Sequence, residues 1–222
     1  MHPLYEEFIS YLNHADKENC VRFVFSHLDR ADLDIVTLYK ELLKPAQNEK
    51  ACRDDQQKLC IWEEHLRTSI VRTIIECCYP YLIREREHLF GQTFKGKAVV
   101  LCPPGESHEI GARMVADFFT LSGFQSYFIG ANTPQDDIID AIKYTRPAYV
   151  AISITTAFNL VAVGNAFQNI LGLKTAIPFQ VILGGQACQQ NLSICHRLGA
   201  DLVLQTFEEI HDLSENQPDV IS

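Results

Sequence analysis

Two different hydrophobic patterns divide the chain near residue 90. Before that point apolar residues recur every three or four positions, the spacing that places them on one face of an α-helix. This pattern predicts helices over 4–12, 21–28 and 32–43, and a longer helix over about 55–83. Four helices with short connections are typical of a small bundle, so we interpret residues 1–90 as a helical domain.

Capping and helix-breaking residues refine these boundaries. Asp32 or Asp34 can cap the third helix, because a carboxylate at that position accepts a free backbone N–H, and Pro45 is expected to end it. Pro80 is expected to kink or interrupt the fourth helix. Residues 84–97, REREHLFGQTFKGK, are interpreted as a linker. The predicted apolar stripe of the fourth helix consists of Leu66, Ile70, Ile74, Cys77 and Tyr81.

Beyond the linker, short apolar runs alternate with helical patterns. The runs predict strands at 98–102, 126–130, 149–154, 179–185 and 201–205. The segments between them predict helices over 109–122, 135–145, 157–171 and 188–198, with a frayed tail after about 212. Strands that are apolar throughout and alternate with helices form a parallel sheet covered on both faces. We therefore predict an α/β fold, in which a helical bundle precedes a flavodoxin-like (Rossmann-like), doubly wound five-stranded sheet over residues 91–222.

The composition changes which partners we expect. The chain is 47% hydrophobic and 21% charged, as in ordinary globular proteins. No apolar run reaches the roughly 18 to 20 residues of a membrane span, and the first residues lack the cationic start of a secretory signal, so we expect a cytoplasmic protein. The net charge is −9 without a dense Lys/Arg block, whereas a phosphate backbone is bound by clustered cations. We therefore expect no direct contact with nucleic acid or membrane, and an output through a protein partner.

The eight cysteines contain no C-x-x-C pair. Several lie within apolar runs, where a reduced thiol behaves as a small hydrophobic side chain. We therefore interpret them as buried thiols rather than as disulfides or metal ligands. They are Cys20, Cys52, Cys60, Cys77, Cys78, Cys102, Cys188 and Cys195.

Candidate chemistry gathers after the first, third and fourth predicted strands. In a sheet of order 2-1-3-4-5 these strands are neighbours, and ligands bind beyond their carboxyl ends. The segments there are PPGESHEIG (103–111), SITT (153–156) and GGQ (184–186). A neutral imidazole binds borderline transition metals, and a nearby carboxylate can hold its other ring nitrogen.

Within these segments His108 is the candidate metal ligand and Glu106 its candidate partner. Glu109 is expected to be a first-turn acid that complements the helix dipole. Gly184 and Gly185 would let a ligand approach the main chain, and Gly111 would let the first helix pack close to a ligand or a strand. Each feature has a simpler interpretation: an isolated histidine after a strand is commonly an exposed polar residue, and a Gly-Gly pair is commonly a turn. The residues alone predict a ligand site without naming the ligand.

The spacing of these segments resembles a known family. The family is the cobalamin-binding domain shared by methionine synthase, corrinoid proteins and cobalamin photoreceptors, whose pattern is D/E-x-H-x-x-G, then S-x-L or S-x-T, then G-G. The resemblance covers about 95–207 and implies a cobalamin (vitamin B12) site. The matching residues are Glu106, Ser107, His108, Gly111, Ser153, Thr155, Gly184 and Gly185.

The resemblance also implies roles for these residues. His108 would coordinate the cobalt from below in place of the displaced dimethylbenzimidazole. Ser153 and Thr155 would form hydrogen bonds with the displaced nucleotide tail, against which the Gly184–Gly185 backbone would pack. One departure is that Glu106 stands where many methyltransferase members carry Asp.

By the same resemblance, the helical domain is a cap over the upper face of the corrin. Residues 60–76, CIWEEHLRTSIVRTIIE, are similar to the cap segment of light-responsive, cobalamin-dependent regulators. Glu64 and His65 match its E-H pair, which lies near the upper ligand. The Trp that precedes this pair by ten residues would fall at Asp54 and is missing, while Trp62 stands nearby. The simpler interpretation of Glu64 and His65 is an exposed polar face.

Two functions follow from the resemblance. The first is a sensor, which could be a photoreceptor. Its upper ligand, adenosyl or methyl, would control binding to a protein partner such as a transcriptional regulator. We expect no winged-helix DNA-reading segment ahead of the cap. The second is a corrinoid protein that carries methyl groups between methyltransferases. A module that binds no cofactor is the third and weakest interpretation. Separately, exposed helices of the cap could form the interface of a homo-oligomer.

Overall fold

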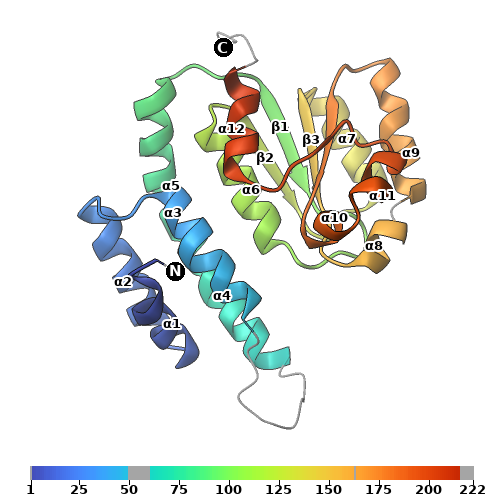
Figure 1. Ribbon diagram of the computed structural model, residues 1–222. Helices are drawn as coiled ribbons and strands as arrows, with labels where there is room; N and C mark the ends of the chain where they lie inside the picture. The colour runs from blue at the N-terminus through green and yellow to red at the C-terminus, as the bar shows by residue number, and fades with distance from the viewer. Residues whose placement is uncertain (1, 50–60, 163, 216–222) are drawn as a thin grey trace. The chain divides into compact units, whose positions relative to one another are not determined.

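The computed structural model describes residues 2–49, 61–162 and 164–215. The chain divides into two compact units, Met1–Arg84 and Glu85–Ser222. The first consists of helices, and the second combines helices with a parallel sheet (Figure 1). We call them the helical unit and the α/β unit.

The helical unit begins with two helices and a third helical run. The helices are α1 (Tyr5–Asn13) and α2 (Lys17–Asp29), and the run consists of α3 (Ile35–Thr37), η1 (Leu38–Leu43) and α4 (Lys44–Asn48). Of the two predicted caps for the third helix, Asp34 is the one observed, because its carboxylate accepts the Thr37 N–H at 2.6 Å. Asp16 caps α2 in the same way through Asn19.

The prediction that Pro45 ends the third helix is wrong. The helical run continues through Pro45 to Asn48 because the preceding segment, η1, is a π-helix. In this wider turn the Lys44 N–H bonds to the carbonyl of Tyr39, five residues back. Proline clashes with the preceding turn of an α-helix, and a widened turn relieves that clash.

Of the two effects predicted for Pro80, a kink or an interruption of the fourth helix, the interruption is wrong. Helix α5 runs unbroken over Ile61–Phe90 with Pro80 inside it. Tyr81, directly after the proline, is anchored by a 2.6 Å hydrogen bond from its hydroxyl to Asp29 and by stacking on Phe25 at 5.6 Å between ring centroids. This packing stabilises the helix beyond the proline, so the predicted linker at 84–97 shortens to residues 91–96.

The buried stripe of α5 is rotated from the predicted one. Ile70 and Ile74 are buried as predicted, but Leu66 and Cys77 are exposed and Tyr81 is only half-buried. The buried positions occur as pairs of neighbouring residues that repeat every helical turn, so the buried apolar face of α5 is wider than a single row of side chains. The further buried apolar positions are Val71, Ile75, Cys78 and Leu82.

Arg67 of α5 ties the ends of two other helices together. Its guanidinium donates to the carbonyl of Ala46 at 2.8 Å and to the side-chain oxygen of Asn13 at 2.9 Å. Glu49 lies 3.7 Å from the same guanidinium and accepts a 2.7 Å hydrogen bond from Tyr5. A cation at the carbonyl end of a helix satisfies groups that have no partner within the helix.

The α/β unit contains five parallel strands in the order β2-β1-β3-β4-β5. This is the predicted flavodoxin-like order, so the predicted fold class is confirmed. The strands are β1 (Lys97–Leu101), β2 (Gln125–Gly130), β3 (Tyr149–Ser153), β4 (Gln180–Gly184) and β5 (Leu202–Val203).

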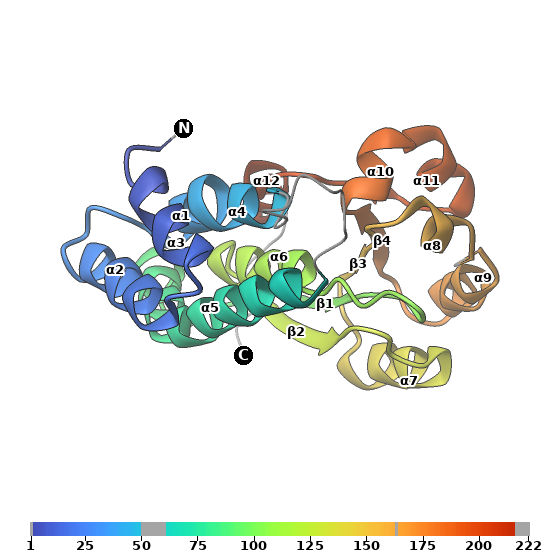
Figure 2. The same ribbon diagram turned by 90° about the horizontal axis from the view of Figure 1, so that it is seen from below.

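Helices cover both faces of the sheet (Figures 1 and 2). On one face α6 (Ile110–Leu121) packs on β1 and β2, and α12 (Phe207–Glu215) packs on α6 through Phe207 and Phe118. The other face carries α7 (Gln135–Thr145), α8 (Ala157–Ala162), α9 (Gly164–Gly172), α10 (Gln186–Gln190) and α11 (Leu192–Leu198). The short turn η2 (Leu173–Thr175) follows α9.

Three helices differ from the prediction. The region predicted as one helix over 157–171 contains α8 and α9, and the one over 188–198 is divided at Asn191, whose backbone is not helical. Helix α12 was not predicted. It begins with a capping box in which Glu209 accepts the Thr206 N–H at 3.0 Å while the Thr206 hydroxyl accepts the Glu209 N–H at 3.3 Å.

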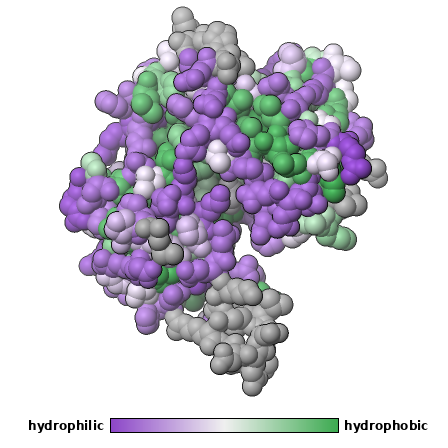
Figure 3. Space-filling view, in the orientation of Figure 1, coloured by the Kyte–Doolittle hydropathy of each residue, from purple (hydrophilic) through white to green (hydrophobic). Residues whose placement is uncertain are grey.

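The sheet is buried between these layers. Valine, leucine and isoleucine from β1, β3 and β4 pack with α7, α8, α9, α10 and α11 in one continuous apolar cluster, against which partly buried residues of β2 and β5 pack. The face seen in Figure 3 is largely hydrophilic, with smaller groups of hydrophobic residues. Among the helices of the described residues, none combines the length and apolar character needed to cross a bilayer.

Candidate functional site

The residues after β1, β3 and β4 meet at the carboxyl edge of the sheet. Strand β3 lies between β1 and β4, and Ser153 at its end is paired with Gly184. The Thr155 N–H, just beyond β3, donates to Glu106 from the β1–α6 loop at 3.0 Å. The structure therefore brings together the three segments that the sequence singled out.

The β1–α6 loop leaves the sheet through a tight turn. The Glu106 N–H bonds to the Pro103 carbonyl at 3.0 Å, with Pro104 and Gly105 between them. Gly105 has φ of +82°, so the turn has proline and a left-handed glycine where a type II turn requires them. The Gly105 N–H donates to the side-chain oxygen of Asn132, which follows β2, at 2.8 Å. The Pro-Pro-Gly sequence thus redirects the chain so that the next residues lie along the sheet edge.

The Glu106 carboxylate is fully buried and accepts four hydrogen bonds. Its Oε1 meets the Nδ1 of His108 at 2.5 Å and the His108 N–H at 3.1 Å. Its Oε2 accepts the Thr155 N–H and, at 2.9 Å, the side-chain amide of Asn159. The one carboxylate therefore fastens the loop after β1 to the segment after β3.

These bonds determine the ionisation of Glu106. Burial alone would raise the pKa of its carboxyl, but the hydrogen bonds, led by that from Asn159, outweigh burial and lower the pKa from 4.5 to about 2. Glu106 is therefore an anion at neutral pH and can only accept hydrogen bonds. The Nδ1 of His108 that faces it must carry a proton.

This pairing prepares His108 as a ligand. A neutral imidazole protonated at Nδ1 keeps its lone pair on Nε2, and a carboxylate on Nδ1 raises the basicity of that lone pair. The His108 side chain is 51% exposed, in contrast to the fully buried Glu106. The site therefore presents one oriented, accessible imidazole.

The residues after β3 include a buried hydroxyl. Ser153 is 9% exposed at the end of the strand, whereas Thr155 is half-buried. Thr156 accepts the Asn159 N–H at 3.3 Å and so starts α8. Thr155 thus lies against Glu106, to which its N–H donates, and Ser153 is the last residue of β3, the strand before it.

The backbone packing around the end of β4 requires glycine at positions 184 and 185. Gly185 has φ of +93°, and a Cβ there would collide with the backbone of Ile154. A Cβ at Gly184 would lie 2.9 Å from the carbonyl oxygen of Leu204. The backbone at the end of β4 therefore packs closely against the segments that follow β3 and β5.

Gly111 and Ser107 have fewer contacts. A Cβ at Gly111, in the first turn of α6, would meet nothing within 4 Å, so the expectation that it allows α6 to pack closely against a strand is wrong. Ser107 is exposed between Glu106 and His108.

Trp62, Glu64 and His65 lie on the first turns of α5, in the helical unit. All three are exposed, and Trp62 is 68% exposed. They are not among the residues that hydrogen-bond to Glu106. Asp54, where the missing Trp would fall, is outside the described residues.

The described cysteines are all reduced. Five are buried, as predicted, and Cys77 is exposed. Cys52 and Cys60 lie outside the described residues. Within the described ranges no three His, Cys, Asp or Glu side chains come together as a metal site. The buried thiols are Cys20, Cys78, Cys102, Cys188 and Cys195.

Sequence reasoning missed two asparagines that support the site. Asn159 is buried and bonds to both Glu106 and, at 3.5 Å, the Gly105 carbonyl. Asn132, at φ of +52°, donates its own N–H to the Glu106 carbonyl at 3.1 Å. The only available signal was a polar residue in the first turn of a predicted amphipathic helix, which is too common to single out Asn159.

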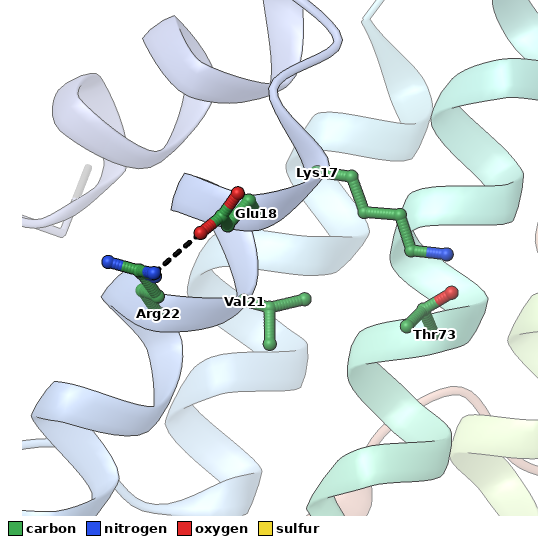
Figure 4. Close-up of a pocket in the computed structure, with 5 residues that line it drawn as sticks. All are labelled: Lys17, Glu18, Val21, Arg22 and Thr73. Carbon is green, nitrogen blue, oxygen red and sulfur yellow. Dashed lines mark ion pairs between the residues drawn. The ribbon is translucent and has the colours of Figure 1, made fainter.

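A separate hollow of about 550 Å³ lies within the helical unit, between α2 and α5 (Figure 4). Lys17 and Thr73 face each other across it, and Glu18 pairs with Arg22 at 2.5 Å along α2. Both members of this pair are mostly exposed, so the pair adds little stability. We interpret this hollow as a solvated helix surface.

Comparison with protein families identifies the α/β unit. The model of the B12 binding domain matches residues 96–214, which include all five strands and the Glu106–His108 loop. This is more than half of the chain.

Two relatives come from Myxococcus xanthus. The HTH-type transcriptional repressor CarA is 26% identical over 155 residues, which cover 69% of this chain and 50% of CarA. The HTH-type transcriptional repressor CarH is 24% identical over 172 residues, which cover 76% of this chain and 53% of CarH. The chain thus spans about half the length of these curated relatives. Both alignments are longer than the α/β unit and so extend into the helical unit.

A solved structure shares the fold over nearly the whole chain. The Methanosarcina barkeri monomethylamine corrinoid protein superposes with a TM-score of 0.78, covering 96% of this chain and 97% of that protein. The sequences are 13% identical, so this likeness shows the fold alone.

Proposed function

Because the chain belongs to the B12-binding domain family, we propose that it is a regulatory protein that binds cobalamin through His108 and acts on a protein partner. The observation that carries the proposal is the buried Glu106 carboxylate holding the Nδ1 of an accessible His108. In this proposal the protein is a sensor rather than an enzyme.

The donor set fits a cobalt corrin. A single imidazole supplies one ligand, so a metal held here needs its other ligands from elsewhere, and a corrin would provide four nitrogens. Cobalt is a borderline metal that suits imidazole nitrogen. When bound, cobalamin supplies a cobalt centre with an exchangeable upper ligand.

The residues around His108 have distinct proposed roles. Glu106 fixes the tautomer of His108 and strengthens it as a ligand. Ser153 and Thr155 form hydrogen bonds with the displaced nucleotide tail, and the Gly184–Gly185 backbone packs against it. This arrangement is the base-off, His-on mode of cobalamin binding.

We further propose that the helical unit is the cap over the upper ligand. Trp62, Glu64 and His65 are exposed on α5 and so are free to contact it. The alignments with two transcriptional repressors extend into this unit, which favours a regulator. The proposed form is adenosylcobalamin or methylcobalamin, light is the first signal to test, and a transcriptional regulator is the proposed class of partner.

The alternative is a corrinoid methyl carrier that meets methyltransferases. It is supported by the shared fold with the monomethylamine corrinoid protein, in which both chains are covered almost completely. At 13% identity this observation carries less weight than the sequence similarity to the repressors.

An absorption experiment separates the two functions. The purified protein is incubated with adenosylcobalamin or methylcobalamin in the dark, desalted, and illuminated while its spectrum and its elution volume are recorded. A sensor retains adenosylcobalamin with a His-on spectrum and changes its assembly state after illumination. A preference for methylcobalamin, with unchanged assembly after illumination, would instead support the methyl carrier.

A substitution tests the role of His108. His108→Ala should abolish the His-on spectrum, while His196→Ala, at an exposed position on α11 in the same unit, should leave it unchanged. An unaltered spectrum in His108→Ala would contradict the proposed coordination.

A further inference from the structure

Cations gather at the amino edge of the sheet, the edge opposite to the one that carries His108. The sequence has a net charge of −9 and no dense block of Lys or Arg. On one face of the sheet, however, α7, η2 and α11 each lead into the start of a strand and each end with basic residues. These residues are Lys143, Lys174, His196 and Arg197. The fold thus collects charges on one edge that are far apart in the sequence.

Lys97 and Arg146 add to this group at the starts of two neighbouring strands. Lys97 is the first residue of β1, and its carbonyl accepts the N–H of Ala148, two residues after Arg146, at 2.8 Å. Side chains alternate along a strand, so Lys97 lies on the same face as Val99, which packs in one apolar cluster with Ile142 of α7. Lys97 therefore lies on the face that also carries the end of α7.

Three of these cations are not neutralised within the protein. Lys174 pairs with Asp201 at 2.6 Å. Lys97, Arg146 and Arg197 are exposed, and none of them forms an ion pair with any other residue in the ranges that the structure describes. Cations at the end of a helix offset the partial negative charge of its last carbonyls, but Lys97 is on a strand and has no such role.

Arg146 occupies a position where glycine is usual. It ends α7 in the left-handed conformation, with φ of +47°, and its N–H bonds to the Ile142 carbonyl at 2.9 Å. A side chain is unfavourable in this conformation, and α11 ends with Gly199 in the same region of φ. Pro147 restricts the preceding residue further. Retaining arginine here is unfavourable for the backbone, which indicates a role for its exposed guanidinium outside the fold.

Tyr144 provides an apolar contact beside these charges. Its side chain is 89% exposed, more than any other large hydrophobic side chain of the described residues. The neighbouring Lys143 pairs with Asp140 only at 3.6 Å, and both are largely exposed. Tyrosine and arginine are enriched where proteins bind one another, because both can bury a large planar group. We call Lys97, Tyr144, Arg146 and Arg197 the basic edge.

We propose that the basic edge binds an acidic segment of the partner protein. The segment would carry Asp or Glu side chains for the three cations and an apolar side chain for Tyr144. This inference rests on the proposed function, which supplies the partner, and assigns that partner a surface away from the cobalamin site. A short acidic segment fits better than nucleic acid, because the chain is acidic overall and would repel a long phosphate backbone beyond these few cations.

A peptide-binding experiment tests the basic edge. The probe is a fluorescein-labelled peptide of glutamate residues around a central leucine, and its binding to the full chain is followed by fluorescence anisotropy. Lys97→Gln and Arg146→Gly should each weaken binding by roughly fivefold, and added salt should weaken it further. Tyr144→Ser should weaken binding of this peptide but not of one without the leucine. Arg22→Gln, which removes an exposed cation of α2, is the matched control and should bind like wild type.

The stability of Arg146→Gly separates a binding role from a structural one. Glycine adopts a positive φ without strain, so the unfolding temperature should stay constant or rise while peptide binding falls. A clear fall in unfolding temperature would show that Arg146 is retained to end α7, and this result would overturn the inference.

The outcomes also distinguish this inference from the proposed function. If the protein binds cobalamin but not the peptide, or if the variants bind the peptide as well as wild type does, the inference is wrong and the proposed function stands. Tighter binding of short duplex DNA than of the peptide would overturn the inference in favour of a nucleic-acid surface. Peptide binding that depends on these residues, in a protein that does not bind cobalamin, would support the surface and contradict the proposed function.

Discussion

Substituting Glu106 with glutamine tests the central feature of the site without any cofactor. Glutamine has the same size but replaces one carboxylate oxygen with an amide nitrogen that cannot accept hydrogen bonds. Each oxygen of Glu106 accepts two bonds, from His108 on one side and from Thr155 and Asn159 on the other. With the new amide nitrogen on the Thr155 and Asn159 side, two donors therefore face a donor; on the His108 side the backbone N–H does so, and the imidazole must move its proton from Nδ1 to Nε2.

The expected loss of stability can be worked out in two ways. Lowering the pKa of the Glu106 carboxyl from 4.5 to about 2 corresponds to about 3 kcal/mol in favour of the anion. Losing two bonds to a charged acceptor, at about 1.5 kcal/mol or more each, gives a similar figure. We therefore expect Glu106→Gln to lower the free energy of unfolding by about 3 kcal/mol at pH 7.

Urea unfolding of the cofactor-free protein, followed by circular dichroism, measures this quantity. Glu215→Gln, at an exposed position in α12, is the control and should change stability by less than about 0.5 kcal/mol. Asn159→Ala removes one of the four bonds and should cost about 1 to 2 kcal/mol. If Glu106→Gln is as stable as the control, the hydrogen bonds do not hold the anion as described and the reasoning is refuted.

Three further substitutions probe other parts of the α/β unit. Gly185→Ala should lower the free energy of unfolding in urea by more than about 2 kcal/mol, because Gly185 has a positive φ and a Cβ there would collide with Ile154. A smaller loss would show that the turn after β4 can shift. Gly111→Ala should raise cofactor-free stability by about 0.5 to 1 kcal/mol, and a simultaneous loss of cobalamin affinity, measured by titration, would place the ligand against α6. Asp201→Asn should cost about 1 kcal/mol at pH 7, because Asp201 accepts the Val181 N–H and pairs with Lys174. Burial opposes ionisation of Asp201, but these partners lower its pKa below 3.8. Its contribution is therefore full above pH 3.8 and declines as the pH falls through the lowered pKa; a difference between wild type and variant that does not shrink as the pH is lowered below 3.8 would contradict this.

The sheet was predictable because its local and global patterns agree. Strands buried on both faces are apolar throughout, and their alternation with helices leaves few topologies. The wrong helix predictions lie at positions where tertiary packing overrides a local sequence rule. Pro45 and Pro80 break an isolated helix, but a π-turn before one and the anchored Tyr81 after the other keep the helix intact. Helix α12 was missed although its Thr206-x-x-Glu209 capping box is visible in the sequence.

The candidate site was predictable in part for a similar reason. Glu106 and His108 are two residues apart, so their pairing needs only one turn. The carboxyl edge of a parallel sheet then places Thr155 nearby. Asn159 and Asn132 were not predictable, because their roles depend on contacts across the fold that no spacing in the sequence records.

The Glu106 hydrogen bonds also have a consequence for the order of folding. Two of them reach Thr155 and Asn159, which are 49 and 53 residues away along the chain. Contacts between distant residues form only after the intervening loop has closed, so the carboxylate cannot be buried with its partners until β1 and β3 are paired. The orientation of His108 therefore follows the pairing of β1 and β3, and a chain that has not paired them would not have prepared the proposed cobalt ligand.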